Sequence, residues 1–168
     1  MRLVLAAIAL TLAAPALAAP APKVAATSFT QLKTPLPLPY DETADAKAQV
    51  AAARARAKAQ HKLLLIDLGG NWCLDCRLLA GTMELPELRG FLAKHYEIVT
   101  VDVGRFDKNL DIAAKYGLNG HFGGGVPSVL IVDPKTDSLK NAGRTAALAD
   151  ARSLSPQALA DWLASWVR

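Results

Sequence analysis

In the stretch Gly69-Gly70-Asn71-Trp72-Cys73-Leu74-Asp75-Cys76-Arg77 an apolar strand pattern gives way to a helical one, and both cysteines of the chain lie there. One helical turn would bring the α-carbons of Cys73 and Cys76 to about 5 Å, within the range that a disulfide requires. The first sulfur would lie at the helix start, where unpaired backbone N–H groups favour a thiolate. The spacing therefore predicts a reversible disulfide that takes part in thiol–disulfide exchange.

The N-terminus has the pattern of a secretory signal peptide. Met1-Arg2 is followed by an apolar run from Leu3 to Ala14 and by the small-x-small site Pro15-Ala16-Leu17-Ala18. We expect residues 1–18 to be removed and the protein to be periplasmic or secreted. The run is short and rich in alanine, so no stable membrane insertion is expected after cleavage.

Length and charge predict one domain without a nucleic-acid site. Removing 18 of the 168 residues leaves about 150, enough for a single core. The net charge of +4 is dispersed along the chain, which argues against nucleic acid as a partner, and we expect a monomer. A disulfide between cysteines three residues apart adds little stability, so a redox role explains the pair better than a structural one.

The first half of the chain alternates helical and strand patterns. Residues 19–40, rich in proline and alanine, are expected to form an extended and partly mobile lead-in. Three elements should follow: an alanine-rich helix over 43–60 capped by Asp41 or Thr43, a buried strand over 63–68, and a helix from 73 that is interrupted at Leu85-Pro86 and continues over 87–94.

The second half contains the remaining strands. The patterns predict strands over 96–103, 126–132 and 139–142, a short helix over 109–116, and a last helix capped by Ser155. The order of elements predicts an α/β domain over 41–168, with a central mixed sheet of four to five strands flanked by helices.

Four features of the chain from Thr43 onward resemble the thioredoxin superfamily. Asp67 lies six residues before the first cysteine, Trp72 directly precedes it, two residues separate the cysteines, and Val126-Pro127-Ser128 opens a later strand. The resemblance implies a thioredoxin-like fold, and it implies that the Val126–Pro127 peptide is cis and faces the disulfide. It also places Trp72, Val126 and Pro127 in the substrate-binding surface.

The residue types suit distinct roles in disulfide exchange. Cys73 should be the exposed nucleophile, and Cys76 should attack the mixed disulfide, the alternative being an inert core thiol. A buried carboxylate at Asp67 requires neutralisation or a polar partner, and the resemblance implies a proton acceptor for Cys76. A strand-end carboxylate in solvent is the alternative for Asp67, and ordinary core packing is the alternative for Trp72.

Leu74-Asp75 replaces the Gly-Pro that is commonest in the family at this site. The Asp75 charge should oppose a thiolate at Cys73 by about one pKa unit. We therefore predict a dithiol that is a better reductant than those of the strongly oxidising members.

The stretch His121-Phe122-Gly123-Gly124-Gly125 is a second departure from the family pattern. It lies just before Pro127 and could select the partner that docks, or it could be flexible glycine filler. His121 could tune Cys73 or bind a metal, although a single loop histidine usually does neither.

These features favour an exported thiol–disulfide oxidoreductase that reduces or exchanges protein disulfides. It would need no bound cofactor or metal, and its partners would be protein thiols or disulfides and an upstream electron donor. The alternative is a copper carrier that uses the two cysteines with His61, His95 or His121. Covalent haem is disfavoured because Arg77 stands where the attachment motif has histidine.

Overall fold

The computed structural model describes residues 19–120 and 122–167. The predicted signal peptide (residues 1–18) and His121 lie outside these residues. In chain order the elements are η1 (Phe29–Gln31), α1 (Ala46–Ala59), β1 (Leu63–Gly69), α2 (Leu74–Met83), α3 (Pro86–His95), β2 (Tyr96–Asp102), α4 (Leu110–Lys115), β3 (Ser128–Asp133), β4 (Ser138–Leu139), η2 (Ala151–Ser153) and α5 (Pro156–Ala164).

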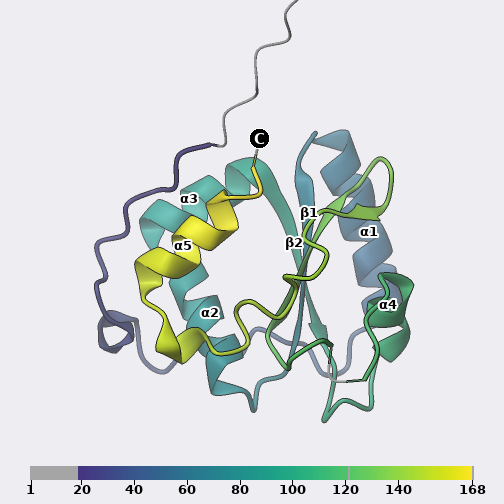
Figure 1. Cartoon of the computed structure of the whole chain (residues 1–168), viewed down its shortest axis with the longest axis horizontal. Helices are drawn as coiled ribbons and strands as arrows, with labels where there is room; N and C mark the ends of the chain where they lie inside the picture. The colour runs from purple at the N-terminus through teal and green to yellow at the C-terminus, as the bar shows by residue number, and fades with distance from the viewer. Residues whose placement is uncertain (1–18, 121, 168) are drawn as a thin grey trace, which may run out of the picture.

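The sheet has four strands in the order β2-β1-β3-β4. β1 pairs with β2 in parallel and with β3 antiparallel, and β3 pairs with β4 antiparallel. Figure 1 shows α2, α3 and α5 on one side of this sheet and α1 and α4 on the other. The predicted α/β fold with a mixed sheet between helices is therefore confirmed.

β1 is the central strand, and both of its faces are covered. Leu64, Ile66 and Leu68 belong to the core cluster that includes α1, whereas Leu65 belongs to the cluster that includes α3 and α5. The run of aliphatic residues that predicted a doubly buried strand reflects this position. Because β1 is fixed on both faces, the loop that follows Gly69 leaves the sheet from a rigid base.

The ends of two elements differ from the prediction. α1 begins at Ala46 and is capped by Asp45, because Asp41 and Thr43 hydrogen-bond to each other in a separate turn. β4 covers only Ser138–Leu139. The side chain of Asn141 then bonds to β3, accepting from the backbone N–H of Ile131 and donating to the carbonyl of Val129.

Other helix boundaries follow the sequence pattern. The break between α2 and α3 falls at Leu85, with Pro86 in the first turn of α3, and Ser155 caps α5 through the backbone N–H of Ala158. The short 3-10 helices η1 and η2 were not predicted, since three residues carry too little periodicity to be recognised.

The lead-in, residues 19–40, is extended as predicted but is packed against the domain. The backbone N–H of Ala19 donates to the carbonyl of Val167, and that of Val24 donates to the side chain of Gln157. Leu32 and Tyr40 are buried at 4% and 3% exposure. The expectation of partial mobility rested on composition, which does not show where isolated apolar side chains are buried. Within 19–120 and 122–167, no helix is long and apolar enough to cross a membrane.

Candidate active site

Cys73 and Cys76 lie at the N-terminal end of α2, directly after the loop that leaves β1. Cys73 is the N-cap residue, and its sulfur accepts a hydrogen bond of 3.2 Å from the backbone N–H of Cys76. Both are free thiols in this structure. The cap geometry stabilises negative charge on the first sulfur and places the second one turn further along the helix.

The two thiols have opposite pKa shifts. The Cys76 thiol and the Cys76 backbone N–H act against burial and lower the pKa of Cys73 to about 7. Interaction with Cys73, burial and the charge of Asp67 raise the pKa of Cys76. At neutral pH Cys73 is therefore partly ionised to the thiolate, while Cys76 keeps its proton.

Cys73 is less exposed than predicted. Its exposed fraction is 6%, against 0% for Cys76. The Cys73 thiol donates a hydrogen bond of 3.4 Å to the carbonyl of Val126, so the loop before β3 covers part of the sulfur. The order of access remains the predicted one, with Cys73 nearer to solvent.

The loop before β3 contains the predicted cis-proline. The Val126–Pro127 peptide is cis, and Val126 contacts Cys73 through the hydrogen bond above. The structure thus brings Val126 and the dithiol together, although they are separated by 53 positions in the chain.

Trp72 lies on the surface beside the dithiol. Its side chain is 42% exposed, and its indole N–H donates to the carbonyl of Gly104 at 2.7 Å. Phe106 contacts its edge, and the guanidinium of Arg105 lies 4.5 Å above its ring. These contacts hold Trp72 as an exposed platform and exclude ordinary core packing as its explanation.

Asp67 is buried in β1, at 1% exposure. Burial raises the pKa of its carboxyl to about 7, against a smaller lowering by the Tyr40 hydroxyl. Asp67 Oδ1 has no hydrogen-bond partner among the described residues. An unsatisfied buried oxygen costs about 1–3 kcal/mol, so this carboxyl is not a strand-end group in solvent.

Asp75 opposes the Cys73 thiolate as predicted, but the structure adds a cationic partner for its carboxylate. Its carboxylate is 6% exposed and receives hydrogen bonds from Arg152, through the backbone N–H at 2.9 Å and through Nε and Nη2 of the guanidinium at 3.0 and 2.6 Å. Although burial raises the pKa of Asp75, these bonds produce a net lowering. Asp75 still opposes the Cys73 thiolate, but the nearby guanidinium offsets its charge.

Two further residues near the site were missed from the sequence. Arg152 lies 77 positions from Asp75, and no local pattern marks it as a partner. Tyr40 belongs to the lead-in. The side chain of Asn71 accepts a hydrogen bond from the backbone N–H of Tyr40 at 3.1 Å and donates one to the backbone carbonyl of Tyr40 at 2.8 Å. A tyrosine that ends a proline-rich segment gave no signal of a role at the dithiol.

The glycine-rich loop before Pro127 is anchored rather than simple filler. Phe122 is buried at 1% exposure and packs against Phe106. Gly124 has a φ of 153°, and a β-carbon there would lie 3.2 Å from that of Ala146, so the loop needs glycine at this point. The predicted tuning or metal-binding role of His121 falls outside the described residues.

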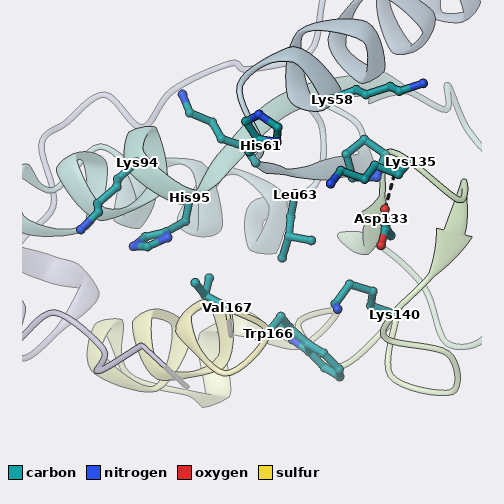
Figure 2. A pocket seen from close by; sticks show the side chains of 12 residues that line it. Lys58, His61, Leu63, Lys94, His95, Asp133, Lys135, Lys140, Trp166 and Val167 are labelled. Atoms are coloured by element: carbon teal, nitrogen blue, oxygen red, sulfur yellow. Dashed lines mark hydrogen bonds between the residues drawn. The ribbon is translucent and has the colours of Figure 1, made fainter. Parts of the chain in front are cut away.

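His61 and His95 lie far from the dithiol, in a basic pocket of about 240 Å³. Figure 2 shows the pocket around Leu63, the first residue of β1, whereas the dithiol follows the last residue of that strand. Seven residues of strand span about 20 Å, so neither histidine can share a metal with the cysteines. Within 19–120 and 122–167, no cluster of three His, Cys, Asp or Glu side chains could hold a metal.

Helix ends explain part of the basic character of this pocket. The last turns of α1 and α3 contribute Lys58, Lys94 and His95, whereas Lys135 and Lys140 come from the segments that flank β4. Cations at helix C-termini offset the negative end of the helix dipole. The charges at the helix ends therefore balance the backbone and do not by themselves indicate an anion site.

Comparisons with known proteins agree with the fold. A family model described as thioredoxin-like matches residues 45–134. The crystal structure of a disulphide isomerase from Xylella fastidiosa Temecula1 is similar, with 40% sequence identity and a TM-score of 0.70; the match covers 77% of this chain and 96% of that one. The C-terminal domain of Neisseria meningitidis DsbD in the oxidised form has 24% identity and a TM-score of 0.43, over 58% of this chain and 80% of that one. No curated protein sequence matches the chain.

The mixed sheet and the Cys-x-x-Cys pair at the start of α2 define the class of thiol–disulfide oxidoreductases in general. More specifically, the chain belongs to the thioredoxin-like family.

Proposed function

We propose that this protein is an exported thiol–disulfide oxidoreductase that reduces or exchanges protein disulfides through a reversible Cys73–Cys76 disulfide. The observation that carries the proposal is the asymmetry of the two thiols: the Cys73 sulfur caps α2 and accepts from the backbone N–H of Cys76, whereas Cys76 is fully buried. The pKa of Cys73 is lowered and that of Cys76 is raised accordingly. This is the arrangement that a nucleophile and a resolving thiol require.

The reaction has two exchange steps. The Cys73 thiolate attacks one sulfur of a substrate disulfide, forms a mixed disulfide and releases the other substrate sulfur as a thiolate. Cys76 then loses its proton and attacks Cys73, which forms the Cys73–Cys76 disulfide and releases the second substrate thiolate. Two electrons pass to the substrate, and an upstream thiol donor reduces the protein again by the reverse exchange.

Asp67 is the proposed acceptor for the Cys76 proton. Its raised pKa of about 7 is matched to proton transfer near neutral pH. Its charge raises the pKa of Cys76, so protonation of Asp67 as Cys76 loses its proton avoids two adjacent buried charges. No bound cofactor or metal enters this scheme.

The substrate is proposed to lie across Trp72, Val126 and Pro127. Trp72 provides an exposed aromatic surface, and Leu74, which directly follows Cys73 in the chain, is 44% exposed. An apolar surface around one reactive sulfur suits polypeptide segments that flank a disulfide.

Trapping of the mixed disulfide tests the proposal. In a Cys76→Ser variant the second step is blocked, so we expect covalent complexes with exported proteins that dissolve on addition of a reductant. The matched Cys73→Ser variant should give none. Absence of any mixed disulfide through Cys73 would overturn the proposed exchange mechanism.

Export is a separate part of the proposal and has its own test. We expect the protein recovered from cells to begin at Ala19, as determined by mass spectrometry of the intact chain. A chain that keeps residues 1–18 and stays in the cytoplasm would contradict the exported role while leaving the dithiol chemistry intact.

A further inference from the structure

Three polar groups meet in a buried space behind the dithiol: the Cys76 thiol, the Asp67 carboxyl and the Tyr40 hydroxyl. Gly69 shows how close two of them are. A β-carbon at Gly69 would lie 2.3 Å from the Tyr40 hydroxyl oxygen and 2.8 Å from the Cys76 sulfur. Only glycine at position 69 leaves room for both groups. The Tyr40 hydroxyl and the Cys76 sulfur therefore lie next to each other, beside the α-carbon of Gly69.

Tyr40 lies near Asp67 as well. Asp67 pairs with Thr100 in the register of β1 and β2, and the Thr100 hydroxyl donates to the carbonyl of Pro39, the residue before Tyr40, at 2.8 Å. The pKa of the Tyr40 hydroxyl is raised by burial and further by both the Asp67 carboxylate and the Cys76 sulfur. Asp67 in turn raises the pKa of Cys76 through its charge. Neither the Tyr40 hydroxyl nor Asp67 Oδ1 has a hydrogen-bond partner among the described residues, so each has an unused hydrogen-bonding site in this space.

The position of Tyr40 is fixed from several sides. The side chain of Asn71, in the loop directly before Cys73, forms two hydrogen bonds with the Tyr40 backbone. The Thr100 hydroxyl donates to the carbonyl of Pro39 at 2.8 Å, and the Arg77 guanidinium donates to the carbonyls of Leu36 and Pro37. The lead-in therefore forms a strap that holds this tyrosine against the site.

We infer that the Tyr40 hydroxyl links Cys76 to Asp67 and mediates transfer of the Cys76 proton to the Asp67 carboxylate. The inference rests on the proposed function and adds a residue from the lead-in to it. The hydroxyl both donates and accepts, which is what a link between a thiol and a carboxylate requires.

The proton balance of the step is simple. As Cys76 attacks the mixed disulfide, its proton passes to the Tyr40 oxygen and the Tyr40 proton passes to Asp67 Oδ1. The electron pair left on Cys76 forms the new bond to Cys73, and the substrate thiolate leaves. Tyr40 is unchanged at the end, and Asp67 is protonated.

The Tyr40→Phe variant removes only the oxygen. Attack of Cys73 on a small disulfide should keep its wild-type rate, whereas resolution of the mixed disulfide should slow about tenfold at neutral pH. The hydroxyl lowers the pKa of Asp67, so its loss should move the pH profile of resolution to higher pH. Rapid acid quenching and separation of the mixed disulfide measure both rates.

The matched control is Tyr96→Phe. Tyr96 is equally buried, but its hydroxyl donates to the carbonyl of Leu163 at 2.7 Å, in the other core cluster. This variant should lose stability while both exchange rates stay at their wild-type values. A general packing effect of removing a buried hydroxyl would instead slow resolution in both variants.

Two further measurements exclude a purely structural role. In an Asp67→Asn background, Tyr40→Phe should cause no additional slowing, since the hydroxyl acts through the carboxylate. If Tyr40→Phe does not fold, 3-fluorotyrosine at position 40 keeps the shape and makes the hydroxyl a stronger donor. It should shift the resolution profile to lower pH, opposite to the phenylalanine variant.

The outcomes distinguish failure of the role of Tyr40 from failure of the proposed exchange function. Resolution by Tyr40→Phe at the wild-type rate and with the wild-type pH profile would overturn the role of Tyr40 alone, as would an unshifted profile with fluorotyrosine. Failure of the wild-type protein to form or resolve a mixed disulfide would overturn the proposed function together with this inference.

Discussion

Cys73 acquires its character from a few nearby groups. The Cys76 thiol and backbone N–H lower its pKa, and Asp75 opposes them. Arg152 binds Asp75, and this interaction raises the pKa of Arg152. The negative charge of Cys73 raises it further. The charge of Asp75, one of the two residues that replace Gly-Pro between the cysteines, is thus offset by a guanidinium from η2.

Removal of Arg152 should weaken the Cys73 thiolate. In Arg152→Gln the Asp75 charge is no longer offset, so we expect the pKa of Cys73 to rise from about 7 by up to about one unit. The ultraviolet absorbance of the thiolate, followed against pH in the reduced protein, measures this. Arg56→Gln is the control, since Arg56 pairs with Glu97. A Cys73 titration curve that coincides with that of the wild type would contradict the role of Arg152.

Asp67 should make the folded protein less stable as the pH rises. Its carboxyl has a pKa of about 7 when folded and about 4 when unfolded, so the folded state binds the proton more tightly. Stability from this group is complete below pH 4 and is lost as the pH rises toward 7.

The Asp67→Asn variant carries no such charge. Its free energy of unfolding in urea should match the wild type near pH 4 and exceed it by a few kcal/mol at pH 8. Equal pH dependence of the two proteins would show that the Asp67 pKa is not raised.

Sequence reasoning identified the residues whose roles follow from local spacing. Cys73, Cys76 and Asp67 lie within ten positions of one another around a strand-to-helix junction. Tyr40 and Arg152 were not identified, because packing alone brings them to the site. Tyr40 lies 31 positions from its partner Asn71, and Arg152 lies 77 positions from Asp75. Distance along the chain hides such partners, since one chain alone gives no evidence of which distant residues meet.

At the scale of elements, the lead-in is the largest departure from expectation. Its prolines disfavour an α-helix, and the carbonyls of the extended segment around them accept hydrogen bonds from Arg77 and Thr100. A capping box between Ser28 and Gln31 fixes η1, and Leu32 is the C-cap residue of this short helix. A β-carbon at Gly81 of α2 would lie 3.3 Å from Leu32, so the segment packs closely on that helix.

Leu32 should therefore act as an anchor of the lead-in. Leu32→Ala should lower the free energy of unfolding by about 2–4 kcal/mol, because it removes a buried side chain from a close-packed contact. Leu38→Ala, in the same segment at 64% exposure, should change stability by less than about 0.5 kcal/mol. Urea unfolding followed by tryptophan fluorescence compares them, and equal losses in the two variants would show that the segment is not docked through Leu32.

At the scale of the whole molecule, the two ends of the sheet differ in character. The dithiol, Trp72 and the loop before β3 gather where β1 ends, while the lysine-rich pocket lies where β1 begins. Asp67 thus belongs to the central strand and the dithiol follows that strand in the chain, whereas part of the charge at the opposite end balances helix termini.

The reduction potential combines these effects in one measurable quantity. A thiol pKa near 7 is the value of reductant-like dithiols, whereas strongly oxidising ones have values near 3.5. We therefore expect a potential of about −270 to −230 mV, from equilibration with glutathione and separation of the two redox forms. Arg152→Gln should make the dithiol more reducing, since a less stable thiolate favours the disulfide. A wild-type potential near about −120 mV would contradict the assigned state of Cys73, because so strong an oxidant requires a far more stable thiolate.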